Sequence, residues 1–466
     1  MNAWNGRLPA SMQGVRANVL AAISWLESFV DHPIAIFLAA VAVRAAIVLA
    51  LQLHHEPFRG ELQRTAESLA TTGVYGNPYL IPTGPTAHVS PLHTLMVAAM
   101  FYLFGTGIQG EAAVYALNIG LVAMVWSAIP WVATRLCLPR RAALIVAWLG
   151  ALVPFHFLND VRAADAAVSA LALMGVLLTA QPIVQGESLK PGQSVRLGLV
   201  WGLSLLVLPT VVCVVATIAA VGFWIQRTWN YVGRIAIAAA VAILVLAPWA
   251  LRNRAALGEV VWFRSTFGMM LCVSYNDDAW PDAQRNYFGG SYDRCHPLTS
   301  VAAAQRLLDE GEVAYNERVR RESLNWIRRN PGRAGSLLLQ RTLYFWFPRT
   351  GRWYQSLLLS LLSLLALAAI PKLLQEHRSA AILFLVTWSS FPLVYYVMES
   401  AIRYRYPMIW TLLLAGSVLV AGKPTTRPRV RGDKLPSRMT GDSIATREYR
   451  GGNSSSDRGL LSRSSV

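Results

Sequence analysis

The sequence predicts an all-α polytopic membrane protein with about ten transmembrane helices. Hydrophobic residues make up 54% of its 466 residues and charged residues only 14%, whereas soluble domains carry about 25% charged residues. Several apolar runs approach or exceed the roughly 20 residues that span a bilayer. Basic residues collect in short segments between these runs, as in the cytoplasmic loops of membrane proteins.

Residues 1–33 are expected to form a cytoplasmic N-terminus. We find no cleavable signal, because the apolar run begins late and no small-residue cleavage site follows it. The first span is 34–53, IAIFLAAVAVRAAIVLALQL, with Arg44 near its middle. An arginine at this depth is expected to pair with an acid or to face the interior of the bundle.

An external loop over 54–111 follows the first span. Its opening stretch, HHEPFRGELQRTAESLATTG, has the pattern of a helix and carries the acids Glu56, Glu61 and Glu67. These acids fit the wet face of an interfacial helix, and a catalytic carboxylate is the alternative. The apolar run from Pro91 to Gly105 is too short for a comfortable span, which suits a second helix lying in the interface.

The remaining spans follow from apolar length and from the placement of Lys and Arg. The run 197–225 is long for one helix and short for two, and we predict a break at Pro209. With that break every short basic loop lies on the cytoplasmic side. The transmembrane region is then 34–251 with a C-terminal part at 354–421. The expected spans after the first are 112–134, 141–158, 164–181, 196–208, 210–226, 233–251, 354–373, 379–398 and 404–421.

Residues 252–353 form the second external segment, which we predict to be mixed and mainly helical. A helix is expected to start after Thr299 or Ser300 as N-cap and to end before Pro331. The segment contains Cys272 and Cys295, two of only four cysteines in the chain. They could pair in an oxidising compartment, but their spacing alone does not decide this.

Residues 422–466 are predicted to be a disordered cytoplasmic tail, because they lack apolar periodicity and are rich in Ser, Gly and Arg. From Lys423 onward the tail holds ten Lys and Arg against four Asp and Glu. This tail contributes to the formal net charge of +17. The charge therefore agrees with the positive-inside rule and does not require a nucleic-acid partner.

Polar residues gather at the external ends of the predicted helices. Ionisable groups at membrane depth suggest function, although Asp165 could simply cap a helix and the arginines before Pro407 could anchor a membrane entry. His54, His55, His88 and His93 lie near acids but lack tight ligand spacing. We therefore assign no cofactor and keep a divalent metal ion open.

Several stretches resemble a known family when taken in order. They are GELQRTAESLATTGVYGNPY, TGPTAHVSPLHTLMVAAMFYLFG, DVRAADAAVSALAL, APWALRNRAALGEVVWFRSTFG, GEVAYNERVRRESLNWIRRNPGRAGSLLLQRTLYFW and RYRYPMIW. Their order and spacing over most of residues 30–421 resemble bacterial membrane glycosyltransferases of the GT-C type. The likeness is to the group related to protein O-mannosyltransferases and the lipid A aminoarabinose transferase.

The resemblance implies an inverting glycosyltransferase of the bacterial inner membrane, with its active site on the periplasmic face. The implied donor is a sugar linked to polyprenyl phosphate, held among membrane lipids. The implied acceptor is an extracytoplasmic protein, lipid or glycan of the cell envelope. No nucleic acid is expected as a partner.

The resemblance also assigns roles to residues. It implies that Glu61 is the catalytic base, with a raised pKa through partial desolvation. Many relatives carry Asp-Glu or a lone Asp in this loop, so Glu56 is a rival. Asp165 matches the family's second acidic position. The predicted donor-phosphate residues are Arg403, Arg405 and Arg162, and the predicted donor or acceptor pocket residues are His88, His93 and Asn276.

Two other classes of protein stay open. A polytopic transporter would place polar residues and broken helices near the bilayer midplane, often in inverted repeats, whereas here the acids lie at helix ends. A non-catalytic protein of cell-envelope assembly would keep the fold but would not need a carboxylate at position 61.

Overall fold

The computed structural model describes residues 31–55, 59–154, 161–162 and 165–421. The chain divides into two units, Met1–Gly422 and Lys423–Val466, and every described residue belongs to the first. Three predictions lie outside the described residues: the role of Glu56, the disordered tail over 422–466, and nearly all of the N-terminal segment 1–33.

The described residues fold into helices, with only isolated bridges between Gly76 and Pro85 and between Asp282 and Ser400. The predicted all-α class is therefore confirmed. The α-helices are α2 (Pro33–Ala50), α3 (Glu61–Thr72), α4 (Pro91–Phe104), α5 (Ile108–Arg135), α6 (Arg140–Leu152), α8 (Ala166–Val184), α9 (Pro191–Val207), α10 (Val211–Gln226), α11 (Trp229–Leu257), α12 (Phe267–Ser274), α13 (Ala283–Phe288), α14 (Ser291–Cys295), α15 (Val301–Glu310), α16 (Glu312–Arg329), α17 (Pro331–Trp346), α18 (Trp353–Ala368), α19 (Ile370–Glu376), α20 (Arg378–Ser390), α21 (Leu393–Val397) and α22 (Tyr406–Val420). Two short 3-10 helices, η1 (Leu53–His55) and η2 (Ile402–Arg405), precede α3 and α22.

Six helical segments are long and apolar enough to cross a membrane. They are Pro33–Ala50, Ile108–Arg135, Ala166–Val184, Trp229–Leu257, Trp353–Glu376 and Arg378–Val397. The other four predicted spans fall on the shorter helices α6, α9, α10 and α22. By length and composition the described helices therefore support six of the ten predicted spans. The predicted interfacial helix is α4, with 14 residues.

The break predicted at Pro209 is confirmed as two helices. α9 ends at Val207 and α10 begins at Val211. Proline has no backbone N–H and its ring excludes the preceding turn, so a continuous helix is disfavoured there.

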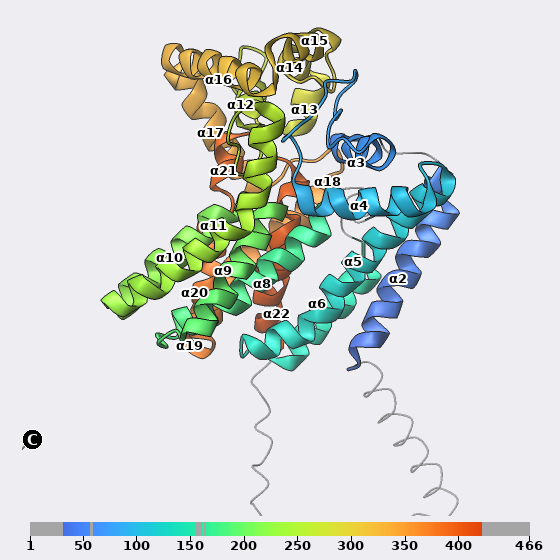
Figure 1. Cartoon of the computed structure of the whole chain (residues 1–466). Helices are drawn as coiled ribbons and strands as arrows, with labels where there is room; N and C mark the ends of the chain where they lie inside the picture. The colour runs from blue at the N-terminus through green and yellow to red at the C-terminus, as the bar shows by residue number, and fades with distance from the viewer. Residues whose placement is uncertain (1–30, 56–58, 155–160, 163–164, 422–466) are drawn as a thin grey trace, which may run out of the picture. The chain divides into compact units, whose positions relative to one another are not determined.

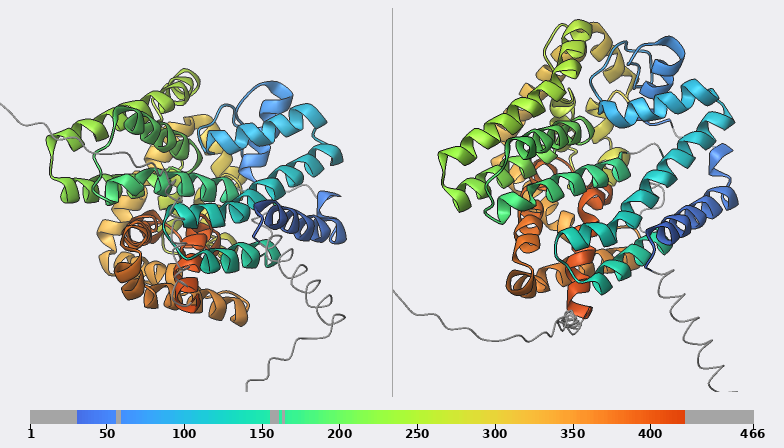
Figure 2. Two further views of the ribbon diagram at one scale, coloured as in Figure 1. Left: turned by 90° about the horizontal axis from the view of Figure 1, so that it is seen from below. Right: turned by 60° about the horizontal axis from the view of Figure 1, so that its bottom comes forward.

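The helices pack around a core made mainly of small and branched apolar side chains. α2 lies against α5 and α6, and the views in Figure 2 keep these blue and teal helices side by side. α22 packs against α6, α8 and α18, and α9 packs against α11. Gly198 and Gly202 permit this last contact, because a Cβ added at either would lie within 3 Å of α11.

Arg44 faces the interior of this bundle. The sequence had left two possibilities for it, an acidic partner or a position in the interior, and the structure shows the second. Its side chain is fully buried, and its guanidinium donates to the carbonyls of Gly150 at 3.0 Å and Ala151 at 2.9 Å. These carbonyls belong to the last turn of α6, where no intrahelical N–H is available.

The polar part of the described chain lies at one end of the bundle. Figure 1 shows α12–α16 gathered there, with α3 beside them. Ser300 caps α15 by accepting from Ala303 N–H, as predicted, and α16 ends just before Pro331. Cys272 on α12 and Cys295 on α14 form a disulfide, which settles the pairing that the sequence left open.

Candidate functional site

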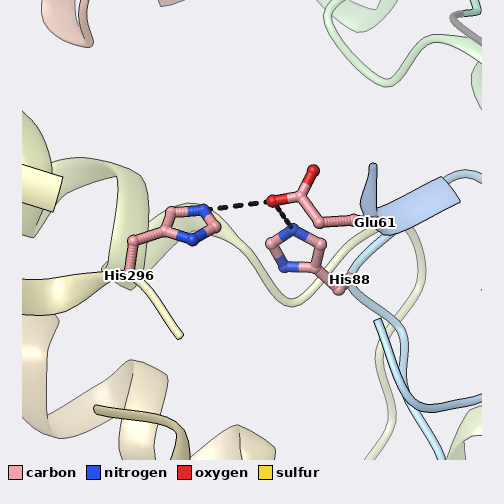
Figure 3. Close-up of side chains that lie close together, drawn as sticks. All are labelled: Glu61, His88 and His296. Atoms are coloured by element: carbon pink, nitrogen blue, oxygen red, sulfur yellow. Dashed lines mark ion pairs between the residues drawn. The ribbon is translucent and has the colours of Figure 1, made fainter. Parts of the chain in front are cut away.

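Glu61, His88 and His296 meet at the polar end, although they are far apart in the sequence (Figure 3). Glu61 is the first residue of α3, following Gly60. His88 lies in the segment that leads to α4, and His296 directly follows α14 and the disulfide residue Cys295. The N-terminus of a helix favours negative charge, so α3 itself supports an ionised Glu61.

The two imidazoles approach the same oxygen of Glu61. Nε2 of His88 and Nε2 of His296 each lie 3.3 Å from Oε1. Both histidine side chains are buried, with 2% and 3% of their surface exposed, whereas 26% of the Glu61 side chain is exposed. One oxygen of the carboxylate is thus held by the protein, and Figure 3 shows the other pointing away from both rings.

The hydrogen bonds on the far side of each ring define which nitrogen carries the proton. Leu298 N–H donates to Nδ1 of His296 at 3.2 Å, so the proton of neutral His296 is on Nε2. The buried Tyr79 hydroxyl lies 2.9 Å from Nδ1 of His88. If Tyr79 donates there, His88 also carries its proton on Nε2. Both rings then donate to Glu61.

The electrostatics agree with a neutral His296 and an ionised Glu61. Burial lowers the pKa of His296 to about 4, against the opposing effect of Glu61. Burial alone would raise the pKa of Glu61, but His88, His296 and Arg264 more than offset it and hold that pKa below its usual value. The raised pKa expected from the sequence is therefore wrong, because partial burial comes with hydrogen-bond donors and a cation.

The segment carrying His88 is clamped by side chains from two later regions. Glu312 accepts from Ala87 N–H at 2.8 Å and from the Thr86 hydroxyl. Arg252 donates to Thr86 O at 2.7 Å. Arg264 donates from Nε to His88 O at 2.6 Å. These contacts fix the backbone on both sides of His88.

His296 is connected to a second buried carboxylate through Tyr292. The rings of His296 and Tyr292 stack with centroids 5.0 Å apart. The Tyr292 hydroxyl donates to Glu399 at 2.6 Å, and Tyr404 donates to the same oxygen at 3.3 Å. Glu399 is fully buried, and burial raises its pKa.

A cavity of about 330 Å³ lies on the other side of Tyr292. Arg403 and Arg349 line it, and the phosphate-binding role of Arg403 stays a prediction. The remaining lining is largely aromatic and polar: Tyr287, Phe288, Tyr344, Asp282, Gln284 and Thr350. The cavity thus offers two cations and flat apolar surfaces, and its lining residue Tyr292 stacks on His296 of the Glu61 cluster.

Glu61, His88 and His296 bring together side chains of the kinds that bind a divalent metal. One ligand atom from each residue lies within 4.8 Å of the others, and imidazole and carboxylate are common zinc ligands. A ligating Nε2 must offer a lone pair, and its Nδ1 usually donates a hydrogen bond. In His296 the Nδ1 accepts instead. Glu61 and His88 could hold a cation, but His296 in this orientation does not fit as the third ligand.

Three other predicted site residues lie together in a different place. His93 on α4 is fully buried, with Nε2 2.9 Å from Asn118 Oδ1, and Asn118 donates to Arg162 O at 3.0 Å. Asp165 interacts electrostatically with His93 and occupies the N-cap position of α8 without a side-chain cap bond. The family roles of His93, Arg162 and Asp165 stay predictions.

Arg405 and Asn276 do not occupy the places expected for them. The Arg405 side chain is 1% exposed and donates to Ser363 Oγ at 2.8 Å and to Trp346 O at 3.4 Å. Asn276 donates to Cys272 O and accepts from Asp278 N–H, both at 2.8 Å. Neither lines the cavity nor belongs to the Glu61 cluster.

Sequence reasoning missed His296 and Arg264, and it grouped Glu399 with the arginines before the last span without giving it a role. The signal for Glu399 was its position just before the arginines at the last span. His296 follows a cysteine whose pairing was open, so its place could not be predicted. Arg264 was one of many arginines in the second external segment and had no distinguishing spacing.

No protein-family model and no curated protein matches the chain. The archaeal oligosaccharyltransferase AglB from Archaeoglobus fulgidus, in complex with an inhibitory peptide and a dolichol-phosphate, is similar in structure, with a TM-score of 0.46 and 14% identity over 83% of this chain and 50% of that one. An Archaeoglobus fulgidus oligosaccharyltransferase tethered with an acceptor peptide is similar with a TM-score of 0.48 and 15% identity, covering 83% of this chain and 49% of that one. ArnT from Cupriavidus metallidurans in the apo state is similar with a TM-score of 0.34 and 14% identity, covering 86% of this chain and 78% of that one.

This chain spans about half the length of the archaeal enzyme. At these identities and TM-scores the likeness assigns neither an activity nor a substrate to it.

Proposed function

We propose that this protein is an integral-membrane glycosyltransferase. It would move a sugar from a polyprenyl-phosphate-linked donor to an extracytoplasmic acceptor hydroxyl. The observation that carries the proposal is the geometry of Glu61: one oxygen is held by two imidazoles, and the side chain is still a quarter exposed. A general base must be ionised and within reach of the acceptor hydroxyl. The lowered pKa keeps Glu61 ionised at neutral pH, and it also makes the carboxylate a weaker base than one with a pKa near the working pH.

The reaction would be a single displacement. The acceptor hydroxyl attacks the anomeric carbon and gives its proton to the open oxygen of Glu61. The bond between the anomeric carbon and the phosphate oxygen breaks, and the phosphate leaves with the electron pair. A single displacement inverts the anomeric configuration, as with the single base of inverting glycosidases.

The protein's other residues would serve the two ends of this displacement. Phosphate leaves readily without a strong acid, and its charge can be stabilised by the fixed, always-charged fork of an arginine. Arg403 lines the cavity next to Tyr292 and is available for this role. The aromatic side chains of the cavity suit the apolar face of a sugar or the first part of a lipid chain.

Replacement of Glu61 tests the proposal most directly. In cells lacking the protein, envelope glycans and lipids are compared by mass spectrometry after complementation with wild type or Glu61→Gln. We expect Glu61→Gln to reduce the transferred sugar by about 10²- to 10⁴-fold, the range of a general base. Membrane insertion and the disulfide are checked in parallel.

Glu67→Gln is the matched control, because Glu67 lies on the same helix, pairs with Arg59 at 3.6 Å and does not belong to the Glu61 cluster. It should restore transfer fully. Near-wild-type transfer by Glu61→Gln would refute the proposed base. A chelator added to purified protein should leave transfer unchanged, since His296 is oriented as a donor.

A further inference from the structure

Arg264 contacts the backbone of His88 and interacts electrostatically with Glu61. No sequence feature had assigned it a role. It lies in the polar segment between α11 and α12 and is half-buried. Its Nε donates to His88 O at 2.6 Å, which fixes the plane of the guanidinium. Among the described residues, its two terminal nitrogens have no hydrogen-bond partner.

This pattern differs from that of Arg252, which holds the same segment. Arg252 donates from Nη1 to Thr86 O at 2.7 Å and from Nη2 to Tyr75 O at 2.6 Å. Both terminal nitrogens of Arg252 are therefore used within the fold. In Arg264 only the inner nitrogen is used, so the part of the fork that binds an oxyanion side-on remains available.

The position of Arg264 relates it to both parts of the site. It is close enough to interact electrostatically with Glu61 and with His296. His296 and Tyr404 are each within the electrostatic range of Arg403 as well. Arg264 and Arg403 therefore act on the same groups from different segments of the chain.

We propose that Arg264, which lies beside the Glu61 cluster and not in the lining of the cavity, binds the phosphate group of the lipid-linked donor. This rests on the proposed function and replaces Arg405 as the second phosphate-binding arginine. The backbone of His88 orients the guanidinium, so the group that binds the leaving phosphate and the group that orients the base share one loop. An anionic partner would form charge-assisted hydrogen bonds with the unpaired N–H groups of this half-buried guanidinium, and such bonds are stronger than those to neutral groups.

Binding of undecaprenyl phosphate to the purified full-length protein in phosphatidylcholine nanodiscs tests the inference. Arg264→Gln is expected to weaken the affinity by roughly 10- to 100-fold, the loss of hydrogen bonds to a charged group. Arg264→Lys keeps the charge without the fork and should fall between wild type and Arg264→Gln.

Arg252→Gln is the matched control, because Arg252 on α11 holds the same His88 segment and both of its terminal nitrogens are already used within the fold. It should lower thermal stability through the lost hydrogen bonds while changing the affinity by less than about threefold. Equal weakening by Arg252→Gln and Arg264→Gln would overturn the inference in favour of loop positioning. Wild-type affinity in Arg264→Gln would also overturn it.

The two proposals fail in different ways. If wild-type protein binds undecaprenyl phosphate but Arg264→Gln binds it equally well, this inference alone is refuted. If wild-type protein does not bind undecaprenyl phosphate, the donor class of the proposed function and this inference are refuted together. Glu61→Gln should still bind the phosphate, since Glu61 acts on the acceptor.

Discussion

The helical bundle and the polar end of this protein use arginine in different ways. In the bundle, the guanidinium groups of Arg44 and Arg405 are buried and donate to backbone carbonyls. At the polar end, Arg264 is half-buried and Arg403 is exposed, and among the described residues each donates from one nitrogen, to His88 O and to the Tyr404 hydroxyl. Arginine thus completes the fold in the bundle, whereas at the polar end it keeps guanidinium N–H groups unpaired within the described part of the chain.

Each buried arginine binds at least one carbonyl at the end of a helix. Arg44 meets the last turn of α6, and Arg405 meets Trp346, the last residue of α17. Arg341 repeats the pattern by donating to Val397 O at 3.0 Å, at the end of α21. The final carbonyls of a helix have no intrahelical donor, and an apolar bundle offers no water to replace one. A cation there also faces the negative end of the helix dipole.

The difference is sharpest within η2, where Arg403 and Arg405 are only two residues apart. Arg403 lines the cavity, and Arg405 is 1% exposed within the bundle. In a helical turn, residues two apart point to different sides. Two arginines in one short motif therefore have separate tasks.

Among substitutions that separate the two uses of arginine, Arg405→Ala is expected to change the free energy of unfolding most. The change leaves a cavity and removes the main cation at the end of α17, so the free energy of unfolding should fall by about 3 kcal/mol. Thermal unfolding in detergent measures this loss. Affinity for undecaprenyl phosphate in the protein that remains folded should stay near wild type, and a selective loss of affinity would instead place Arg405 in the site.

A smaller effect is expected from Glu399→Gln, at the boundary of the two regions. Glu399 accepts from Tyr292, Tyr404 and Asn286. Glutamine offers one oxygen and a competing NH₂ group, so stability should fall by about 1–2 kcal/mol. Sugar transfer should fall as well, because Tyr292 packs on His296. Glu376→Gln, on the exposed end of α19, should alter neither quantity; unchanged transfer in Glu399→Gln would disconnect Glu399 from the site.

The smallest effect is expected from pH, through His296. Its pKa is about 4 in the folded protein and about 6.5 in an unfolded chain. Between these values the unfolded state binds more protons, so stability falls as pH falls. From pH 6.5 to 5.5 the loss should be at most about 1 kcal/mol. Thermal unfolding of wild type and His296→Gln checks this, and an equal slope for both would show that His296 does not titrate as described.

Some of the site residues could be predicted from sequence, because the patterns that mark them lie within short stretches of chain. Glu61 follows an apolar run, belongs to an amphipathic helix and lies in a stretch that resembles a known family. Arg403 lies just before the last apolar run, in the stretch RYRYPMIW that also resembles that family. The pKa direction of Glu61 was not predictable, because it depends on His88, His296 and Arg264 from three other segments.

The sequence by itself determined the helical class, the apolar segments and the break at Pro209. These follow from hydrophobicity and backbone geometry, which act over short stretches of chain. Only the tertiary structure decided that Cys272 pairs with Cys295, that His296 meets Glu61, and that Arg405 is buried while Arg264 is open. The physical reason is that many hydrogen-bond partners and charge neighbours at this site, such as His296 and Arg264 for Glu61, come from segments far apart in the sequence. Local patterns carry no information about such contacts.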